Sequence, residues 1–189
     1  CKKVGDFHLH EISIAEGTLE LNADVELIID SERREKIVSN HSATHLLHSA
    51  LRKVLGESVE QRGSLVNEEK LRFDFSHSNK VTDDQIMEVE DIVNLKIEEA
   101  IDTKTEVLPY EDALKTGALA FFGDKYGEKV RVVYINGDFS VEFCGGTHVR
   151  NTSEIGGFAV TNETSVSSGV RRIEAISGDK YYKESQNAL

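Results

Sequence analysis

The sequence has few cysteines, no long apolar run and no excess of basic residues. Its two cysteines, Cys1 and Cys144, allow at most one disulfide, which excludes a disulfide-rich scaffold and favours a reducing, cytoplasmic setting. No apolar run approaches the roughly 18–20 residues that cross a bilayer, and no signal-peptide pattern opens the chain. With 22 basic and 34 acidic residues, the net charge of −12 argues against non-specific nucleic-acid binding. An RNA partner would need a local basic surface or the help of other domains.

The length and composition indicate one main hydrophobic core. A chain of 189 residues with 39% apolar and 30% charged side chains can form one domain, or one domain and part of another. It begins without methionine and inside a strand-like stretch. These two features predict a fragment of a longer polypeptide.

Apolar periodicity predicts an α+β fold, with a largely antiparallel sheet and packed helices. The expected helices are residues 40–55, 82–101 and, as one or two turns, 111–116. Ser39 or Asn40 is expected to cap the first, and the capping-box pair Thr82 and Gln85 to begin the second. The expected strands are parts of 7–30, then 59–66, 71–75, a short strand ending at Pro109, 130–135, 140–143, 158–162 and 170–176.

Two pairs of metal-ligand residues lie about a hundred residues apart. His41 and His45 are spaced to share one face of a helix, and Cys144 and His148 flank a glycine turn. Imidazole and thiolate ligands together suit zinc. The stripe His41, His45, His48 and Arg52 lies opposite the apolar stripe Ala43, Leu47, Ala50 and Val54, which predicts that the histidines lie on a rim. His48 can replace either helical histidine in this reasoning, so the ligand choice within the helix stays open.

Further polar residues are candidates for substrate contact. The amides of Gly145 and Gly146 can receive an oxyanion or a phosphate, or simply end a strand. Thr44 offers a hydroxyl beside the histidine stripe, and Gln61 an amide on the strand that follows. The candidates for phosphate contact are Arg150, Arg171 and Arg172, although adjacent arginines on a strand usually face opposite sides.

Six motifs in this order resemble the editing domain of alanyl-tRNA synthetase. They are Asn40–His48, Gln61–Leu65, Leu71–His77, Ala120–Tyr126, Cys144–His148 and Gly169–Glu174. The resemblance extends to free-standing alanyl-tRNA editing proteins and to the threonyl-tRNA synthetase editing domain. The sequences Gly-Gly-Thr and Arg-Arg-Ile-Glu, however, resemble those of alanyl enzymes more than those of threonyl enzymes. It implies that residues 1–36 are the tail of a preceding β-barrel, 37–178 the editing domain, and 179–189 the start of a linker to a C-terminal domain.

The resemblance also implies an activity, namely hydrolysis of serine or glycine wrongly esterified to tRNA for alanine. It implies that His41, His45, Cys144 and His148 hold zinc. Cys144, Gln61 and Thr44 would be catalytic, and Thr44, Gln61, Gly145, Gly146 and Arg172 would bind substrate. The partners would be mischarged tRNA and the remaining synthetase domains in cis. The alternatives are a free-standing editing protein and a non-catalytic, zinc-stabilised tRNA-binding module.

Overall fold

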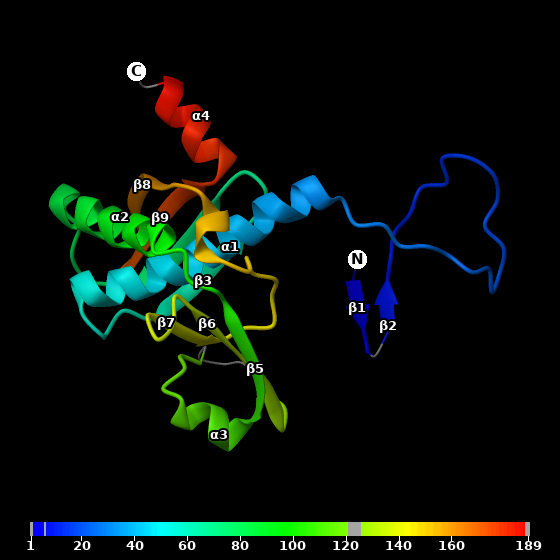
Figure 1. Ribbon diagram of the computed structural model, residues 1–189, viewed down its shortest axis with the longest axis horizontal. Helices are drawn as coiled ribbons and strands as arrows, with labels where there is room; N and C mark the ends of the chain where they lie inside the picture. Colours follow the sequence, from blue (N-terminus) through cyan, green and yellow to red (C-terminus); the bar gives the residue numbers. More distant parts are fainter. Residues whose placement is uncertain (1, 6, 121–125, 188–189) are drawn as a thin grey trace.

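Helix α1 (Ser31–Leu55) contacts two antiparallel sheets in the computed structural model, which describes residues 2–5, 7–120 and 126–187 (Figure 1). The first sheet has the strand order β3 (Gln61–Val66), β4 (Leu71–Ser76), β9 (Val170–Ser177) and β8 (Phe158–Ser167). The second has β5 (Lys104–Pro109), β6 (Lys129–Ile135) and β7 (Ser140–Phe143). The other elements are β1 (Lys2–Val4), β2 (Phe7–Leu9), α2 (Asp83–Glu98), α3 (Tyr110–Lys115), the 3-10 helix η1 (Thr152–Ile155) and α4 (Asp179–Asn187). The predicted α+β class with antiparallel sheets is confirmed.

Helix α1 begins nine residues before the expected start at residue 40, so that expectation was wrong. Asp30 is the cap, since its side chain accepts a hydrogen bond from the backbone N–H of Arg33 at 2.9 Å. Ser39 and Asn40 lie inside the helix and are buried, and they bind distant parts of the chain. Ser39 donates to the carbonyl of Ile155, and Asn40 donates to the carbonyl of Asn67. Polar residues typical of a helix cap serve here as tertiary contacts.

The main core lies between the two long helices and one face of the four-stranded sheet. Alternate residues of β4 point into it, as the pleat of a strand requires: Leu71, Phe73 and Phe75 are fully buried. Helix α1 adds Ala43, Leu46, Leu47, Ala50 and Leu51, and α2 adds Val89, Val93 and Ile97. Because α1 also contacts β6 and β7, both of its sides are covered.

The capping box predicted for the second helix is confirmed. Thr82 accepts from the backbone N–H of Gln85, while the Gln85 side chain accepts from the backbone N–H of Thr82. The helix ends at Glu98, three residues before the expected end, and Ala100 follows with a left-handed φ of 51°. The predicted strands from 59 to 176 are all present, with shifts at their ends.

Residues 2–5 and 7–30 lie away from the rest of the chain (Figure 1). Within the expected strand region 7–30 only Phe7–Leu9 forms a strand, so most of that expectation was wrong. The large apolar side chains here are exposed: Val4, Phe7, Leu9, Ile12, Ile14, Leu19, Leu21, Val25, Leu27, Ile28 and Ile29. A strand needs a neighbour for its backbone hydrogen bonds and its apolar face, and no described segment supplies one. The β-barrel tail and the three domain boundaries stay predictions.

Two other expectations concern residues outside the described ranges, namely Cys1 and positions 121–125 of the motif Ala120–Tyr126. Among the described helices, none combines the length and the apolar character that a bilayer crossing requires.

Candidate metal centre

The middle of α1 carries the first pair of candidate ligands. His41 is half-buried, whereas only 4% of His45 and 3% of His48 is exposed. The prediction that these histidines lie on a rim was therefore wrong for His45 and His48. The physical reason is β7, which packs on that side of α1 and covers what would be an exposed stripe on an isolated helix.

The second pair lies in the loop that leaves β7. The guanidinium of Arg131 donates from Nη1 to the carbonyl of Cys144 at 2.8 Å and to that of Gly146 at 2.7 Å, which holds the turn closed. A Cβ at Gly146 would lie 2.2 Å from Cε1 of His41, so only glycine lets the loop approach the helix this closely. A Cβ at Gly145 would meet nothing within 4 Å.

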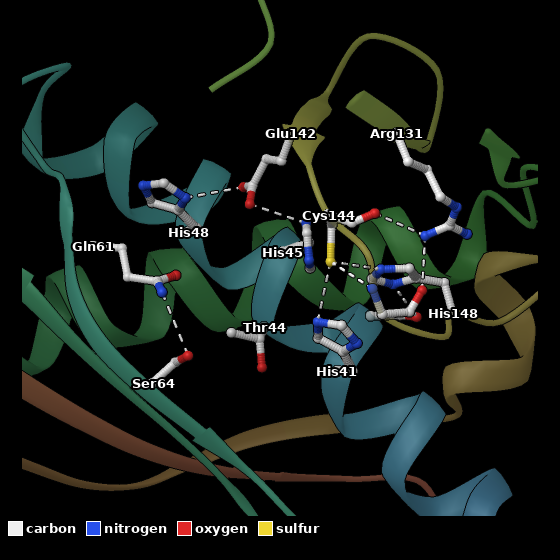
Figure 2. A network of polar contacts seen from close by, with 12 residues as sticks. His41, Thr44, His45, His48, Gln61, Ser64, Arg131, Glu142, Cys144 and His148 are labelled. Atoms are coloured by element: carbon white, nitrogen blue, oxygen red, sulfur yellow. Dashed lines mark hydrogen bonds and ion pairs between the residues drawn. The ribbon is translucent and has the colours of Figure 1, made fainter. Parts of the chain in front are cut away.

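These two segments bring four ligand atoms together. One ligand atom from each of His41, His45, Cys144 and His148 lies within 4.8 Å of the others (Figure 2). The sulfur of Cys144 is 3.5 Å from Nε2 of His41 and 3.3 Å from Nε2 of His148. The four residues that the sequence predicted as a zinc site therefore form one cluster.

The other nitrogen of each clustered imidazole faces a different group. Nδ1 of His41 is 3.0 Å from the carbonyl oxygen of Thr147, and Nδ1 of His148 is 3.2 Å from the hydroxyl of Ser42. Nδ1 of His45 is 3.0 Å from Oε2 of Glu142. Metal-binding histidines use this arrangement, because a partner on one nitrogen orients the other toward the ion.

Cys144 and His148 are in the protonation states that bind a cation, whereas His45 would have to give up a proton. Burial opposes the thiolate, but hydrogen bonds from His148, His41 and His45 lower the pKa of Cys144 to about 3. Burial, together with the charges of His45 and His41, lowers the pKa of His148 to about 4, which leaves a neutral imidazole at neutral pH. A thiolate and a neutral imidazole are the forms that bind zinc.

Glu142 and His48 complete the surroundings of the cluster, and the sequence analysis did not single out Glu142. Burial alone would lower the pKa of His45, but the carboxylate of Glu142 and the hydrogen bond to Cys144 raise it to about 10. His48, which spacing alone left as a possible ligand, is outside the four-residue cluster and binds Glu142 instead. The available signal was an acidic residue between the apolar Val141 and Phe143, two positions before Cys144.

A cavity of about 230 Å³ opens beside His41 and His45. Its wall includes Thr44, Gln61 and Ser64, together with the apolar Ile37, Val66 and Phe73. The hydroxyl of Thr44 donates to the carbonyl of Asn40 at 2.8 Å, so only its lone pairs remain for a ligand. Nε2 of Gln61 is 3.4 Å from the Ser64 hydroxyl. The structure thus brings Thr44 and Gln61 next to the cluster.

The remaining predicted contacts lie elsewhere or are already engaged. Arg172 forms a bidentate ion pair with Asp74, at 2.6 and 2.8 Å. The β4–β9 register places Arg172 on the sheet face away from Phe73 and the cavity. Arg171 binds Glu163, on the other face, as expected for adjacent arginines. Arg150 is exposed, and the amide of Gly146 donates to the sulfur of Cys144 at 3.4 Å.

Comparison with known proteins relates the sequence to aminoacyl-tRNA synthetases. Residues 130–174 match the family model described as the threonyl and alanyl tRNA synthetase second additional domain. Alanine–tRNA ligase of Halalkalibacterium halodurans is 52% identical over 175 residues, which are 93% of this chain and 20% of that protein. The ligases of Listeria innocua and Parvibaculum lavamentivorans are 48% and 47% identical, over 96% and 100% of this chain. The chain spans about a fifth of the length of these relatives. The predicted resemblance is therefore confirmed, and the chain is related over nearly its whole length to a segment of alanine–tRNA ligases.

Proposed function

We propose that this chain hydrolyses the ester of serine or glycine wrongly attached to tRNA for alanine. The observation that carries the proposal is the position of the four-ligand cluster at the wall of a small polar cavity. At about 230 Å³ the cavity is smaller than the ~300–1,000 Å³ typical of drug-sized ligands, and its size suits one aminoacyl group. A purely structural zinc site needs no such opening.

The donor set fits zinc. Three imidazoles and one thiolate would supply the four ligands that zinc takes in proteins, and the other nitrogens of the imidazoles face Thr147, Ser42 and Glu142. When bound, zinc at this position would orient an aminoacyl ester and polarise a group that displaced a loosely held ligand.

Thr44 and Gln61 are proposed to contact the substrate, and Cys144 is proposed to act as a ligand required for hydrolysis. The Thr44 hydroxyl, already donating to Asn40, offers an acceptor to the hydroxyl of a seryl group. An alanyl group would leave such polar atoms unpaired, which disfavours its binding. A second site of this kind is needed because an aminoacylation site gains only ~1–3 kcal/mol of discrimination between amino acids that differ by one small group.

The other predicted contacts have weaker support. The open space around Gly145 is compatible with the close approach of a substrate backbone or ribose. Gly146 contributes mainly by letting the loop reach His41. Arg172 does not line the cavity, so a contact between Arg172 and tRNA would have to occur on the outer face of the sheet. The tRNA, the remaining ligase domains in cis and a cytoplasmic setting are proposed from the relatives.

The decisive experiment offers the purified chain tRNA for alanine charged with serine, glycine or alanine. We expect zinc-dependent loss of the seryl and glycyl esters, with alanyl-tRNA spared. Cys144→Ala is expected to abolish the reaction and to reduce bound zinc. If seryl-tRNA binds but stays intact, even after the other ligase domains are supplied, the non-catalytic tRNA-binding function is the correct one.

A second variant tests the role of Thr44. Thr44→Val keeps the shape of the side chain and removes the hydroxyl, so we expect the preference for seryl over alanyl ester to fall by about tenfold or more. Bound zinc should not change, because Thr44 is not a member of the cluster. An unchanged preference would exclude Thr44 from serine recognition.

A further inference from the structure

His48 is a buried histidine that the proposed metal site does not use as a ligand. Only 3% of it is exposed, and its ring packs against Phe73 with the centroids 5.1 Å apart. Its Nδ1 is 2.9 Å from Oε1 of Glu142. Figure 2 shows His48 and His45 on the same helix, both directed at that carboxylate.

Glu142 divides its two oxygens between the two histidines. Oε2 lies 3.0 Å from Nδ1 of His45, and Oε1 lies 2.9 Å from Nδ1 of His48. Only 2% of Glu142 is exposed, so water does not compete for either oxygen. The contact with His45 is at ion-pair distance, and the contact with His48 also meets the geometry of a hydrogen bond. A carboxylate can only accept, and Nδ1 of His48 is therefore the donor.

We propose that His48 is a positioning residue for the metal ligand His45 and acts through Glu142. Because Oε1 is held by His48, the carboxylate keeps Oε2 on Nδ1 of His45, and this directs Nε2 of His45 toward the cluster. Without His48 the carboxylate of Glu142 can rotate about its Cγ–Cδ bond, and Oε2 then no longer holds His45. The inference rests on the proposed zinc site and adds an outer member to it.

The second nitrogen of His48 supports this role. Nε2 is buried and has no hydrogen-bond partner among the described residues. An unpaired buried polar atom destabilises the fold, and an apolar side chain of similar size would avoid that cost. The nitrogen of His48 that has a partner among the described residues is Nδ1, which holds Glu142.

Three variants of the whole chain test the proposal. His48→Leu removes the donor to Glu142. His48→Asn keeps a donor where Nδ1 stands and removes the unpaired Nε2. Leu51→Ala, one turn further along α1 and fully buried in the core, destabilises the fold without touching Glu142 and is the matched control.

Zinc affinity, measured by competition with a chromogenic chelator, is the first readout. We expect His48→Leu to bind zinc about tenfold more weakly than the original chain, the lower end of what loss of an outer-shell partner costs. His48→Asn should bind within about twofold of the original chain, and Leu51→Ala should unfold at a lower temperature with unchanged affinity. His48→Leu should also unfold at a lower temperature than the original chain when both are metal-free, because Oε1 of the buried Glu142 loses its partner, and Leu51→Ala separates this loss of stability from the loss of zinc affinity.

The spectrum of the cobalt(II)-substituted protein is the second readout, because its visible bands report the geometry of the ligand set. We expect these bands to change in His48→Leu and to be restored in His48→Asn. Equal zinc affinity in His48→Leu and the original chain would overturn the proposal, as would zinc binding in His48→Asn that is as weak as in His48→Leu. Loss of seryl but not glycyl hydrolysis in His48→Asn would also overturn it, because His48 would then contact substrate directly. An original chain that binds no zinc would instead refute the metal site itself.

Discussion

Gly146 and Gly145 are neighbours with opposite surroundings, and this makes them a matched pair. A Cβ on Gly146 would overlap the ring of His41, whereas one on Gly145 would enter open space. We expect Gly146→Ala to displace His41 and weaken zinc binding by about tenfold or more, in the range seen when a ligand loses its orientation. Gly145→Ala should bind zinc nearly as well as the original chain. Chelator competition on the two variants checks this, and equal affinities would show that the loop moves freely.

The ionisable groups of the cluster predict how the stability of the metal-free chain depends on pH. The pKa of Cys144 is lowered from 9.0 to about 3, and the pKa of His45 is raised from 6.5 to about 10. Between pH 6.5 and 9 the unfolded chain holds one proton on Cys144, and the folded chain holds one on His45. Folding then takes up no net proton from this pair, so their contribution to stability is constant in that range.

Outside that range stability should fall on both sides. Below pH 6.5 the unfolded chain also protonates His45 and His148 and then holds three protons, on Cys144, His45 and His148. The folded chain holds only the proton on His45 until the pKa values of about 4 for His148 and about 3 for Cys144 are reached. The unfolded state then binds more protons, and the free energy of unfolding decreases with falling pH. Above pH 9 the unfolded Cys144 has lost its proton while folded His45 keeps one up to its pKa of about 10, so stability decreases again. Urea unfolding of chelator-treated protein from pH 4 to 10 measures this, and a steady slope between 6.5 and 9 would contradict it.

Residue types indicated a ligand set that suits zinc, because thiolate and imidazole are rare and chemically specific, and the resemblance supplied the four residues that form the cluster. Spacing was not sufficient to choose between His45 and His48, which both lie one helical turn from a cluster member. The choice is made by Glu142, which lies 94 residues beyond His48 in the chain and holds it away from the cluster. The sequence analysis did not identify Glu142 because its role depends on which strand packs against α1.

At the scale of elements, the capping box of α2 provides a local test. Thr82→Ala removes the side chain that accepts from Gln85 N–H at 3.2 Å, and we expect a loss of about 1 kcal/mol in the free energy of unfolding. Ser78→Ala, in the exposed loop before the helix, should stay within about 0.5 kcal/mol of the original chain. Denaturant unfolding of both variants measures the difference, and equal losses would show that the cap contributes nothing.

Elements whose signals are local were predicted well. The capping box, the strand that ends at Pro109 and the alternation of β4 depend on neighbouring residues, and all are present. The start of α1 was mistaken because Ser39 and Asn40 have side chains suited to a cap but bind Ile155 and Asn67, on other segments. Local chemistry allowed both uses, and packing selected the second.

At the scale of the whole molecule, residues 2–29 can be removed in a test of their role. A chain beginning at Asp30 keeps the cap of α1 and loses the exposed apolar side chains of the N-terminal segment. We expect it to unfold within about 2 °C of the full chain, since this segment buries no described core residue, and to aggregate less. A chain beginning at Ser39 is the control, and it should unfold several degrees lower because it loses the first two turns of α1. A large loss of stability in the Asp30 chain would show that the segment packs on the body.

The sequence by itself determined the fold class, most of the elements and the residue types of the candidate metal site. These follow from periodicity, caps and ligand types, which are properties of neighbouring residues. The tertiary structure alone decided that His45 and His48 are buried, that Glu142 joins them, that Arg172 faces away, and that the cluster borders a cavity. These features depend on which segments pack together across about a hundred residues of chain. Burial and orientation are set by that packing, and spacing along the chain does not specify them.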